Sequence, residues 1–165
     1  KTRQKANIGF RKGDFSYFFY KTMHPKNEKE LLNDQMMMYQ TYLIDKFRSN
    51  GFIAWLNRAT GGRFTRVTNI FFSKYKSGCF LSPHCDKNNG RIAFVLNLTH
   101  NWQPEWGGIL HVMNKERTKI IDSFVPTFNS LVLMDLPNKE GLPHYVSHIL
   151  SNVDRSRFAI TGWLE

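Results

Sequence analysis

A histidine and an aspartate separated by one residue are the part of this sequence best suited to chemistry. His84 and Asp86 follow an apolar, strand-like stretch that begins at Tyr75. On an extended chain, side chains two residues apart point to the same side, so an imidazole and a carboxylate would share one face. A second histidine from later in the chain would complete the two-histidine, one-carboxylate triad that holds Fe(II) and leaves coordination positions open. The pair alone is a common tripeptide, so the rest of the chain must support this reading.

The size and composition of the chain indicate one domain. Its 165 residues are 41% hydrophobic and 15% aromatic, which is enough for one buried core and too little for two ordinary domains. We expect residues 1–62 to form a helical support and residues 63–165 a barrel core. We expect no membrane span and no leader peptide in this sequence, and its first residue, Lys1, indicates a fragment or a processed chain. Cys79 and Cys85 suggest no disulfide framework, so we expect a cytoplasmic location.

The chain is strongly basic, with 23 Lys and Arg residues against 13 Asp and Glu residues and a net charge of +10. Such a balance favours an anionic partner, whether a nucleic acid, a ribonucleoprotein or an acidic peptide. No RNA-binding signature or zinc-finger spacing accompanies the charge. Direct nucleic-acid binding therefore has no motif to support it, and a solvated basic surface explains the charge equally well.

Hydrophobic periodicity predicts helices first and strands afterwards. Apolar residues recur every three or four positions over 28–49, and a second helix is expected over 51–60. The aromatic stretch 7–20 suits a short strand or loop. After Gly62 the period is two, and the expected strands are 66–75, 92–98, 109–113, 119–122, 131–134, 145–150 and 157–163. Helices followed by antiparallel strands indicate a mainly β, helix-buttressed sandwich or barrel.

The last expected strand carries a second set of candidate residues. Period-two counting places Arg157, Ala159, Thr161 and Trp163 on one face of this strand. If that face lines the barrel interior, burying Arg157 is costly unless an anion meets it. A dicarboxylate would suit the two-pronged guanidinium. The formal charges of Fe(II), Asp86, 2-oxoglutarate and Arg157 sum to zero. A pocket of low dielectric constant favours such a neutral set, because an uncompensated charge is costly there.

Seven motifs follow one another in the second half of the chain. They are Phe72-Ser73-Lys74-Tyr75, His84-x-Asp86, Gly90 to Leu98, Trp106-Gly107-Gly108, Pro126 to Val132, His144-x-Val146-Ser147 and Arg157 to Trp163. Their order resembles the prolyl 4-hydroxylase-like branch of the Fe(II)/2-oxoglutarate oxygenases. Within this branch the sequence is most similar to the ribosomal-protein prolyl hydroxylases, and the hypoxia-sensing prolyl hydroxylases share the same skeleton. The resemblance covers about residues 66–164.

The resemblance implies a double-stranded β-helix, which is a jelly-roll or cupin-like barrel, and a reaction that uses Fe(II), 2-oxoglutarate and O2, with ascorbate as an optional stimulant. It implies that His84, Asp86 and His144 bind iron and that Arg157 binds the distal carboxylate of 2-oxoglutarate. The further residues expected to contact the cosubstrate are Tyr75, Thr161, Leu110 and Asn97, the last standing where family members often carry tyrosine. The residues expected near the substrate are Arg91 and Trp163.

Two histidines compete for the position of the third iron ligand. His144 and His148 are four residues apart and would share a strand face. The sequence around His144 resembles that around the iron histidine of the ribosomal hydroxylases. The spacing from His148 to Arg157 resembles the hypoxia-sensing branch instead. We favour His144, and the other imidazole would then pack in the core or face the substrate.

Three functions from different classes fit these residues. The first is a hydroxylase of a prolyl residue in a protein or peptide, with a ribosomal or acidic partner suggested by the basic charge. The second is a hydroxylase of a small molecule such as a free amino acid. The third is a barrel without catalysis that binds a metal such as zinc. A nucleic-acid demethylase is a further possibility without a supporting motif, and no membrane partner is expected. Asp86 favours hydroxylation over halogenation, because the related halogenases have a small residue at this position.

Overall fold

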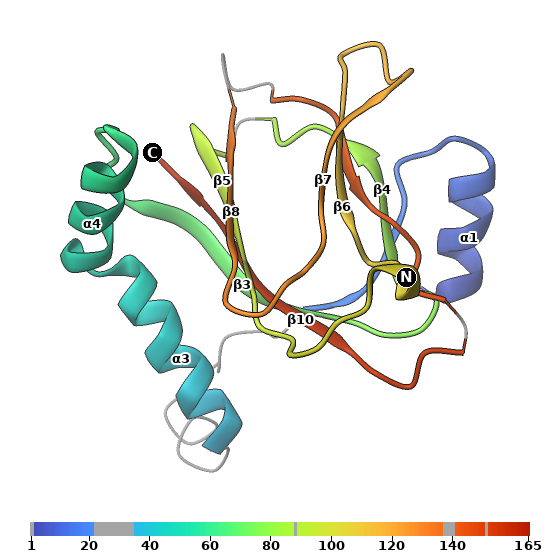
Figure 1. The fold of residues 1–165 in the computed structure, drawn as a ribbon, viewed down its shortest axis with the longest axis horizontal. Helices are drawn as coiled ribbons and strands as arrows, with labels where there is room; N and C mark the ends of the chain where they lie inside the picture. Colours follow the sequence, from blue (N-terminus) through green and yellow to red (C-terminus); the bar gives the residue numbers. More distant parts are fainter. Residues whose placement is uncertain (1, 22–34, 88, 137–140, 151) are drawn as a thin grey trace.

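The computed structural model describes residues 2–21, 35–87, 89–136, 141–150 and 152–165 (Figure 1). Its helices are α1 (Arg3–Arg11), α3 (Gln35–Arg48), α4 (Asn50–Thr60) and the short 3-10 helix η1 (Pro104–Trp106). Its strands are β1 (Tyr17–Phe18), β2 (Tyr20–Lys21), β3 (Val67–Tyr75), β4 (Phe80–His84), β5 (Ile92–Asn97), β6 (Leu110–Met113), β7 (Ile120–Phe124), β8 (Leu131–Asp135), β9 (His144–Val146) and β10 (Arg157–Leu164). The expectation of a mainly β protein with N-terminal helices is confirmed.

The described strands form two antiparallel sheets that face each other. One sheet has the order β1-β4-β9-β6-β7 and the other has the order β2-β3-β10-β5-β8. Among the described residues no strand pairing joins the two sheets, so the expected barrel is an open pair of sheets. The segment that contains β1 and β2 contributes an edge strand to each sheet. The expected helical support before residue 62 therefore also supplies part of the barrel wall.

Strand alternation separates a central core from an outer one. Along β10, the odd-numbered side chains from Arg157 to Trp163 face the space between the sheets, and Ile160 and Leu164 face the helices. The central core lies between the sheets and includes Tyr75, Leu110, Val146 and Ala159. The outer core joins the second sheet to the helices α3 and α4 and includes Ile44, Leu56, Phe94, Ile160 and Leu164. Period-two counting thus agrees with the observed burial of this strand.

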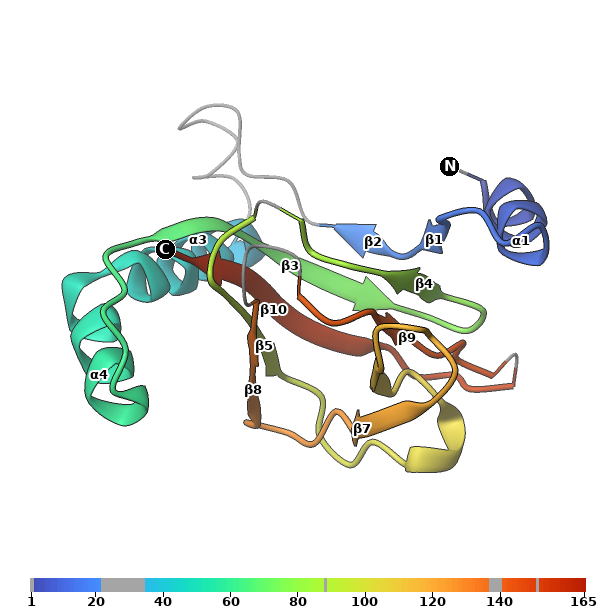
Figure 2. The same ribbon diagram turned by 90° about the horizontal axis from the view of Figure 1, so that it is seen from above.

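The helices lie at two opposite ends of the molecule. Figures 1 and 2 show α3 and α4 beside the second sheet and α1 at the far end, next to β1. Helix α4 ends at Gly61, whose φ of +68° is a left-handed conformation that glycine adopts without strain. Residues 28–34 of the expected first helix lie outside the described residues. No described helix is both long enough and apolar enough to cross a membrane.

Helix α1 corrects the expectation of a strand or loop over the whole of 7–20. The helix begins after Thr2, whose hydroxyl accepts a hydrogen bond from the backbone N–H of Lys5 at 3.4 Å. Such a cap satisfies one of the free N–H groups of the first turn. The helix buries only Ala6, so the aromatic residues that follow it dominated the hydrophobic pattern. The strand part of the expectation holds for β1 and β2.

Replacing Ile160 by alanine should lower the free energy of unfolding by about 2–4 kcal/mol. The side chain is fully buried between β10 and the helices, where it packs in the outer core with Leu56 and Phe94. Its removal would leave a cavity that the sheet cannot close. Chemical denaturation measures the change. Phe158→Ala is the control on the same strand, because Phe158 is 41% exposed; equal losses in both variants would contradict the assignment of Ile160 to the core.

Candidate active site

The pairing of β4 with β9 brings two histidines from distant parts of the sequence together. In this antiparallel pair, His84 lies directly opposite His144. Residues opposite each other on one face of such a pair are close neighbours, and the centroids of the two imidazole rings are 4.3 Å apart. Asp86 follows the end of β4 and reaches both rings. The structure therefore gathers His84, Asp86 and His144 at one point.

The donor atoms of these three residues face one another. The distance from His84 Nε2 to Asp86 Oδ1 is 3.5 Å, and that from His144 Nε2 to Asp86 Oδ2 is 3.6 Å. Among the described residues, this is the group whose ligand atoms, all within 4.8 Å of one another, could hold a metal ion. Two imidazoles and one carboxylate are the ligands of the facial triad of non-haem Fe(II) oxygenases.

Backbone carbonyl groups hold both imidazoles in the tautomer that leaves Nε2 free to bind a metal. Nδ1 of His84 lies 3.0 Å from the carbonyl oxygen of Ser82, and Nδ1 of His144 lies 3.0 Å from that of Leu142. A carbonyl oxygen only accepts hydrogen bonds, so each Nδ1 must carry the proton. Each Nε2 then presents its lone pair toward Asp86, which is how a second hydrogen bond orients metal-binding histidines.

Burial and hydrogen bonds set the charges of the cluster. Burial alone would raise the pKa of Asp86, but the neighbouring imidazoles of His84 and His144 and the hydrogen bond from the Trp163 indole keep that pKa below its ordinary value. The indole Nε1 of Trp163 donates to Asp86 Oδ2 at 2.9 Å. Burial lowers the pKa of His144, which favours the neutral imidazole. An ionised carboxylate and a neutral imidazole are the protonation states that bind a metal.

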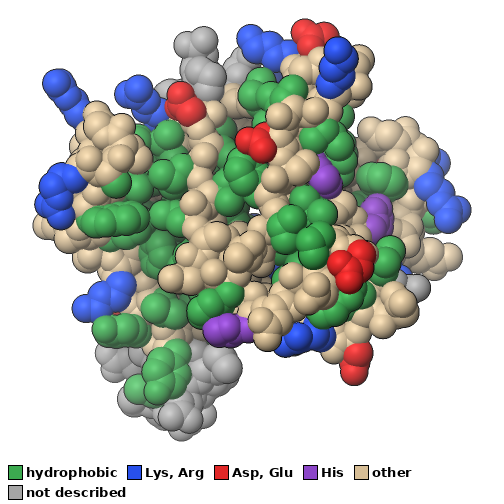
Figure 3. Space-filling view, in the orientation of Figure 1, with side chains coloured by type: hydrophobic (Ala, Val, Ile, Leu, Met, Phe, Trp, Pro, Cys, Tyr) green, Lys and Arg blue, Asp and Glu red, His purple; other side chains and the backbone are tan. Residues whose placement is uncertain are grey.

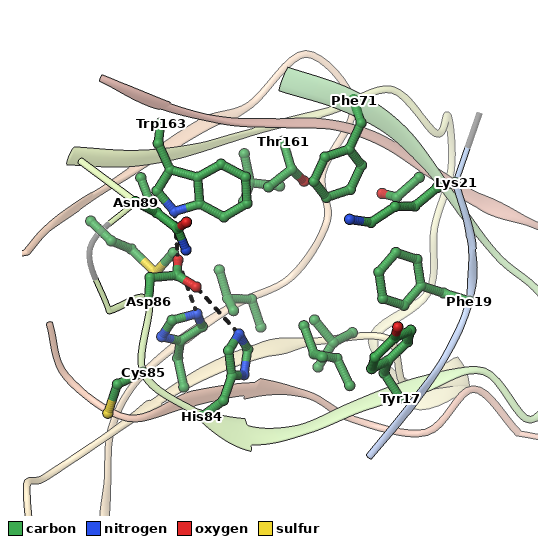
Figure 4. Close-up of a pocket in the computed structure, with 18 of the residues that line it drawn as sticks. Tyr17, Phe19, Lys21, Phe71, His84, Cys85, Asp86, Asn89, Thr161 and Trp163 are labelled. Atoms are coloured by element: carbon green, nitrogen blue, oxygen red, sulfur yellow. Dashed lines mark hydrogen bonds and ion pairs between the residues drawn. The ribbon is translucent and has the colours of Figure 1, made fainter. Parts of the chain in front are cut away.

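The three residues lie at one end of a cavity of about 430 Å³ between the two sheets. Figure 4 shows His84, Asp86 and Trp163 on one side of this cavity and Tyr17, Phe19 and Lys21 on the opposite side. A volume of this size is within the range of small-molecule sites. The cavity therefore has room for a cosubstrate beside the cluster.

Arg157 lines the cavity as a deeply buried cation. It is only 3% exposed, and its guanidinium lies 5.1 Å from the centre of the Tyr75 ring. One terminal nitrogen donates to Asn97 Oδ1 at 3.2 Å, whereas Nε has no hydrogen-bond partner among the described residues. Burial lowers the pKa of this arginine, as expected for a charge with no carboxylate beside it. The site thus offers a donor and a charge that an anionic ligand would satisfy.

The other residues expected to contact the cosubstrate divide into two groups. Tyr75, Thr161 and Leu110 line the cavity with Arg157, and burial raises the pKa of the Tyr75 hydroxyl, which stays protonated as a donor. Asn97 is outside the lining: it accepts from Arg157 and its amide donates to Ser130 Oγ at 3.1 Å. Asn97 therefore orients the arginine. Of the residues expected near the substrate, Trp163 lines the cavity and Arg91 is exposed and outside the lining.

The second candidate for the third iron ligand lies elsewhere. Strand β9 ends at Val146, and the His148 ring stacks on Phe80 with a centroid distance of 4.1 Å and contacts Phe10 at 4.9 Å. His148 is outside the cavity lining. The chain leaves the strand before His148, so counting residues along an extended chain overstated how well it shares a face with His144.

Four residues from the N-terminal segment line the cavity without a role predicted from the sequence. Phe15, Tyr17, Phe19 and Lys21 alternate along the chain and line the cavity, with Tyr17, Phe19 and Lys21 on the side opposite the cluster (Figure 4). The four residues are spaced two apart, and on an extended chain this spacing places side chains on one side. This was the only sign in the sequence that they could act together. Nothing in the local sequence showed that this stretch would lie beside the distant β4 and β3.

Comparison with known proteins gives the class of this chain. It belongs to the 2OG-Fe(II) oxygenase superfamily, whose family model matches residues 70–165, more than half of the chain. It is 29% identical to prolyl 3-hydroxylase OGFOD1 of Mus musculus over 152 residues and 29% identical to that of Xenopus laevis over 163 residues. These matches cover 89% and 95% of this chain but 26% and 30% of the two relatives. The chain thus spans less than a third of their length.

Solved structures show the same fold at low sequence identity. A prolyl 4-hydroxylase from Pseudomonas putida aligns over 98% of this chain and 82% of its own, with a TM-score of 0.58 and 17% identity. A prolyl hydroxylase from Trichoplax adhaerens, solved with a peptide of hypoxia inducible factor, aligns over 98% and 74%, with a TM-score of 0.52 and 20% identity. The two facing antiparallel sheets are therefore the double-stranded β-helix of this superfamily. Membership implies Fe(II) and 2-oxoglutarate, and the cluster and Arg157 fit both.

Proposed function

We propose that this chain is the catalytic domain of a 2-oxoglutarate-dependent dioxygenase that hydroxylates a prolyl residue in a protein or peptide. The observation that carries the proposal is the convergence of His84, Asp86 and His144 in the cavity that Arg157 also lines. Under this proposal, His84, Asp86 and His144 bind Fe(II). Arg157, together with Tyr75 and Thr161, binds 2-oxoglutarate. Fe(II) with 2-oxoglutarate and dioxygen supplies the hydroxylation of an unactivated C–H bond.

The protein residues contribute binding, orientation and exclusion of water. The Ser82 and Leu142 carbonyls keep the imidazoles in the metal-binding tautomer. The Trp163 indole holds the carboxylate of Asp86, and Asn97 holds the guanidinium of Arg157. Val95, Leu110 and Val146 give the cavity apolar lining, which would limit the access of water to a bound cosubstrate. Such preorganised groups strengthen electrostatic interactions with a bound anion.

A protein or peptide is the proposed substrate because the similar proteins include prolyl hydroxylases. A ribosomal or otherwise acidic partner suits the net charge of +10. On the face drawn in Figure 3, the Lys and Arg side chains are spread around the molecule, with no single basic patch, so this face gives no reason to prefer a nucleic acid. A cytoplasmic location belongs to the same proposal and is supported by the two free cysteines.

A substrate screen tests the proposal. The protein, supplied with Fe(II) and 2-oxoglutarate in air, would be incubated with an array of proline-containing peptides that includes ribosomal sequences. We expect succinate formation and a mass gain of one oxygen atom on proline for a subset of peptides. A panel of free amino acids is the parallel experiment. Hydroxylation confined to the free amino acids would refute the protein substrate, and turnover of neither set with both cofactors bound would refute the hydroxylase.

The His144→Ala and His148→Ala variants separate the two candidate iron ligands. Loss of a ligand should weaken Fe(II) binding by at least about a hundredfold, since even supporting groups outside the ligand set contribute ten- to a hundredfold. We expect this loss in His144→Ala and nearly unchanged affinity in His148→Ala, because His148 packs on Phe80. Anaerobic titration with 2-oxoglutarate reports the same difference through the visible absorption of a 2-oxo acid on ferrous iron. The reverse pattern would transfer the ligand role to His148.

A further inference from the structure

The N-terminal segment before the family match places a row of aromatic rings along the cavity. Phe15, Tyr17 and Phe19 project from one side of an extended stretch, with centroid distances of 5.8 Å between the first two rings and 5.4 Å between the last two. All three line the cavity. We name these three residues the aromatic ladder. The ladder precedes residues 70–165, the part of the chain that the family model matches.

The ladder connects the two functional ends of the candidate site. At its outer end, the Phe15 ring lies 5.4 Å from that of His84. At its inner end, Phe19 stacks on Tyr75 with a centroid distance of 4.9 Å and an interplanar angle of 7°. Tyr75 in turn lies beneath the Arg157 guanidinium. Phe19 thus borders the proposed cosubstrate site, and Phe15 borders the proposed metal site.

Hydrogen bonds to β4 hold the ladder in place. The backbone N–H of Ser16 donates to Ser82 Oγ at 2.8 Å, and the backbone N–H of Ser82 donates to the carbonyl oxygen of Ser16 at 2.9 Å. Both serines are buried. The carbonyl of Ser82 also accepts from His84, so a single residue anchors the ladder and orients the neighbouring imidazole. Such a preorganised wall loses little entropy when a ligand binds.

The two outer rings of the ladder are partly exposed to solvent. Phe15 is 52% exposed and Tyr17 is 37% exposed, although both are large aromatic side chains. Exposed apolar surface beside a cavity commonly marks a binding site. Across the cavity stand Asp86 and Trp163 (Figure 4). A group seated between the ladder and Trp163 would therefore lie next to the proposed metal ligands.

We propose that Phe15 and Tyr17 are specificity-determining residues that receive the target prolyl ring of an extended peptide. Aromatic-lined grooves recognise proline because its rigid ring packs flat on aromatic faces and an extended proline segment has little entropy to lose. This inference rests on the proposed hydroxylase function for the reaction, while the contact itself is a binding event. Phe19 is already covered by Tyr75 and Phe71 and serves as the inner boundary of the proline site.

Peptide binding without turnover tests whether the ladder recognises proline. The protein is loaded with Fe(II) and 2-oxoglutarate under anaerobic conditions, and labelled peptides that differ only in a central proline or alanine are titrated by fluorescence polarisation. The wild type should prefer proline. Each of Phe15→Ala and Tyr17→Ala should weaken binding of the proline peptide by about two- to tenfold, as expected for one aromatic contact. The double variant should lose the preference for proline.

Tyr20→Ala is the matched control. Tyr20 lies on the same segment and is 47% exposed, but it is outside the cavity lining, so its removal should leave the preference for proline unchanged. Fe(II) and 2-oxoglutarate affinities in all variants report whether the fold and the cofactor site persist. The Phe15→Tyr and Tyr17→Phe variants keep an aromatic ring at each position. They should bind the proline peptide like the wild type, even where the corresponding alanine variant fails to fold.

The outcomes separate the ladder from the proposed function. The proline-binding role of the ladder would be refuted if the double variant kept the preference for proline or if the wild type had none. This holds even if the wild type hydroxylates proline. A preference for proline that depends on the ladder, without hydroxylation of any peptide in air, would support the proline-binding role of the ladder. The same result would refute the proposed prolyl hydroxylase activity. Loss of binding in Tyr20→Ala equal to that in Tyr17→Ala would also count against the ladder, because the effect would then be general to the segment.

Discussion

The Asp86→Ala variant is expected to bind Fe(II) at least about a hundredfold more weakly than the wild type and to show no 2-oxoglutarate turnover. Asp86 supplies the carboxylate of the cluster and lies within 3.6 Å of both imidazole Nε2 atoms. Its removal leaves two imidazole ligands and no carboxylate charge to balance the metal. Isothermal titration with Fe(II) under anaerobic conditions and a succinate assay in air measure the two effects.

Asp135→Ala is the control for this substitution. Asp135 ends β8 as an exposed carboxylate outside the cavity that holds the cluster, so its loss should change neither Fe(II) affinity nor turnover. Asp86→Asn is the second variant, because it keeps the shape and leaves an acceptor for the Trp163 indole. If Asp86→Asn folds and retains wild-type Fe(II) affinity, Asp86 is removed from the ligand set.

Replacing Arg157 by alanine should weaken 2-oxoglutarate binding by about a hundredfold or more while Fe(II) affinity stays nearly unchanged. A buried, charge-assisted hydrogen bond is worth about 1.5–3 kcal/mol, and a guanidinium can offer two to one carboxylate. Arg157 is only 3% exposed and its Nε has no partner among the described residues. The variant should therefore lose the thermal stabilisation that 2-oxoglutarate gives the wild type.

Two further arginine variants complete this experiment. Arg155→Ala removes a cation two residues earlier, where the exposed guanidinium lies 5.9 Å from the centre of the Trp106 ring, and should bind 2-oxoglutarate like the wild type. Arg157→Lys keeps the charge but lacks the planar fork, so we expect an intermediate affinity. Equal 2-oxoglutarate affinity in Arg157→Ala and the wild type would exclude the proposed cosubstrate role.

Local sequence pattern was sufficient to predict several strands and one helix. The strand expected over 66–75 corresponds to β3 and that over 157–163 to β10, because side chains in a strand alternate with a period of two. The same alternation predicted that Arg157 and Trp163 would share one face. The helix over 51–60 corresponds to α4, whose end at Gly61 was visible in the sequence. Helix α1 was missed because its apolar face is small.

The sequence by itself determined which residues could do chemistry and which way their strands would present them. It contains the His84-x-Asp86 pair, the buried face of the last strand and the ordered motifs of the superfamily. Only the tertiary structure decided which partners meet. The register of β4 against β9 places His144, and not His148, opposite His84, and the pairing of β1 and β2 with distant strands brings the aromatic ladder to the cavity. Strand pairing depends on contacts between residues far apart in the chain, whereas periodicity depends only on neighbours.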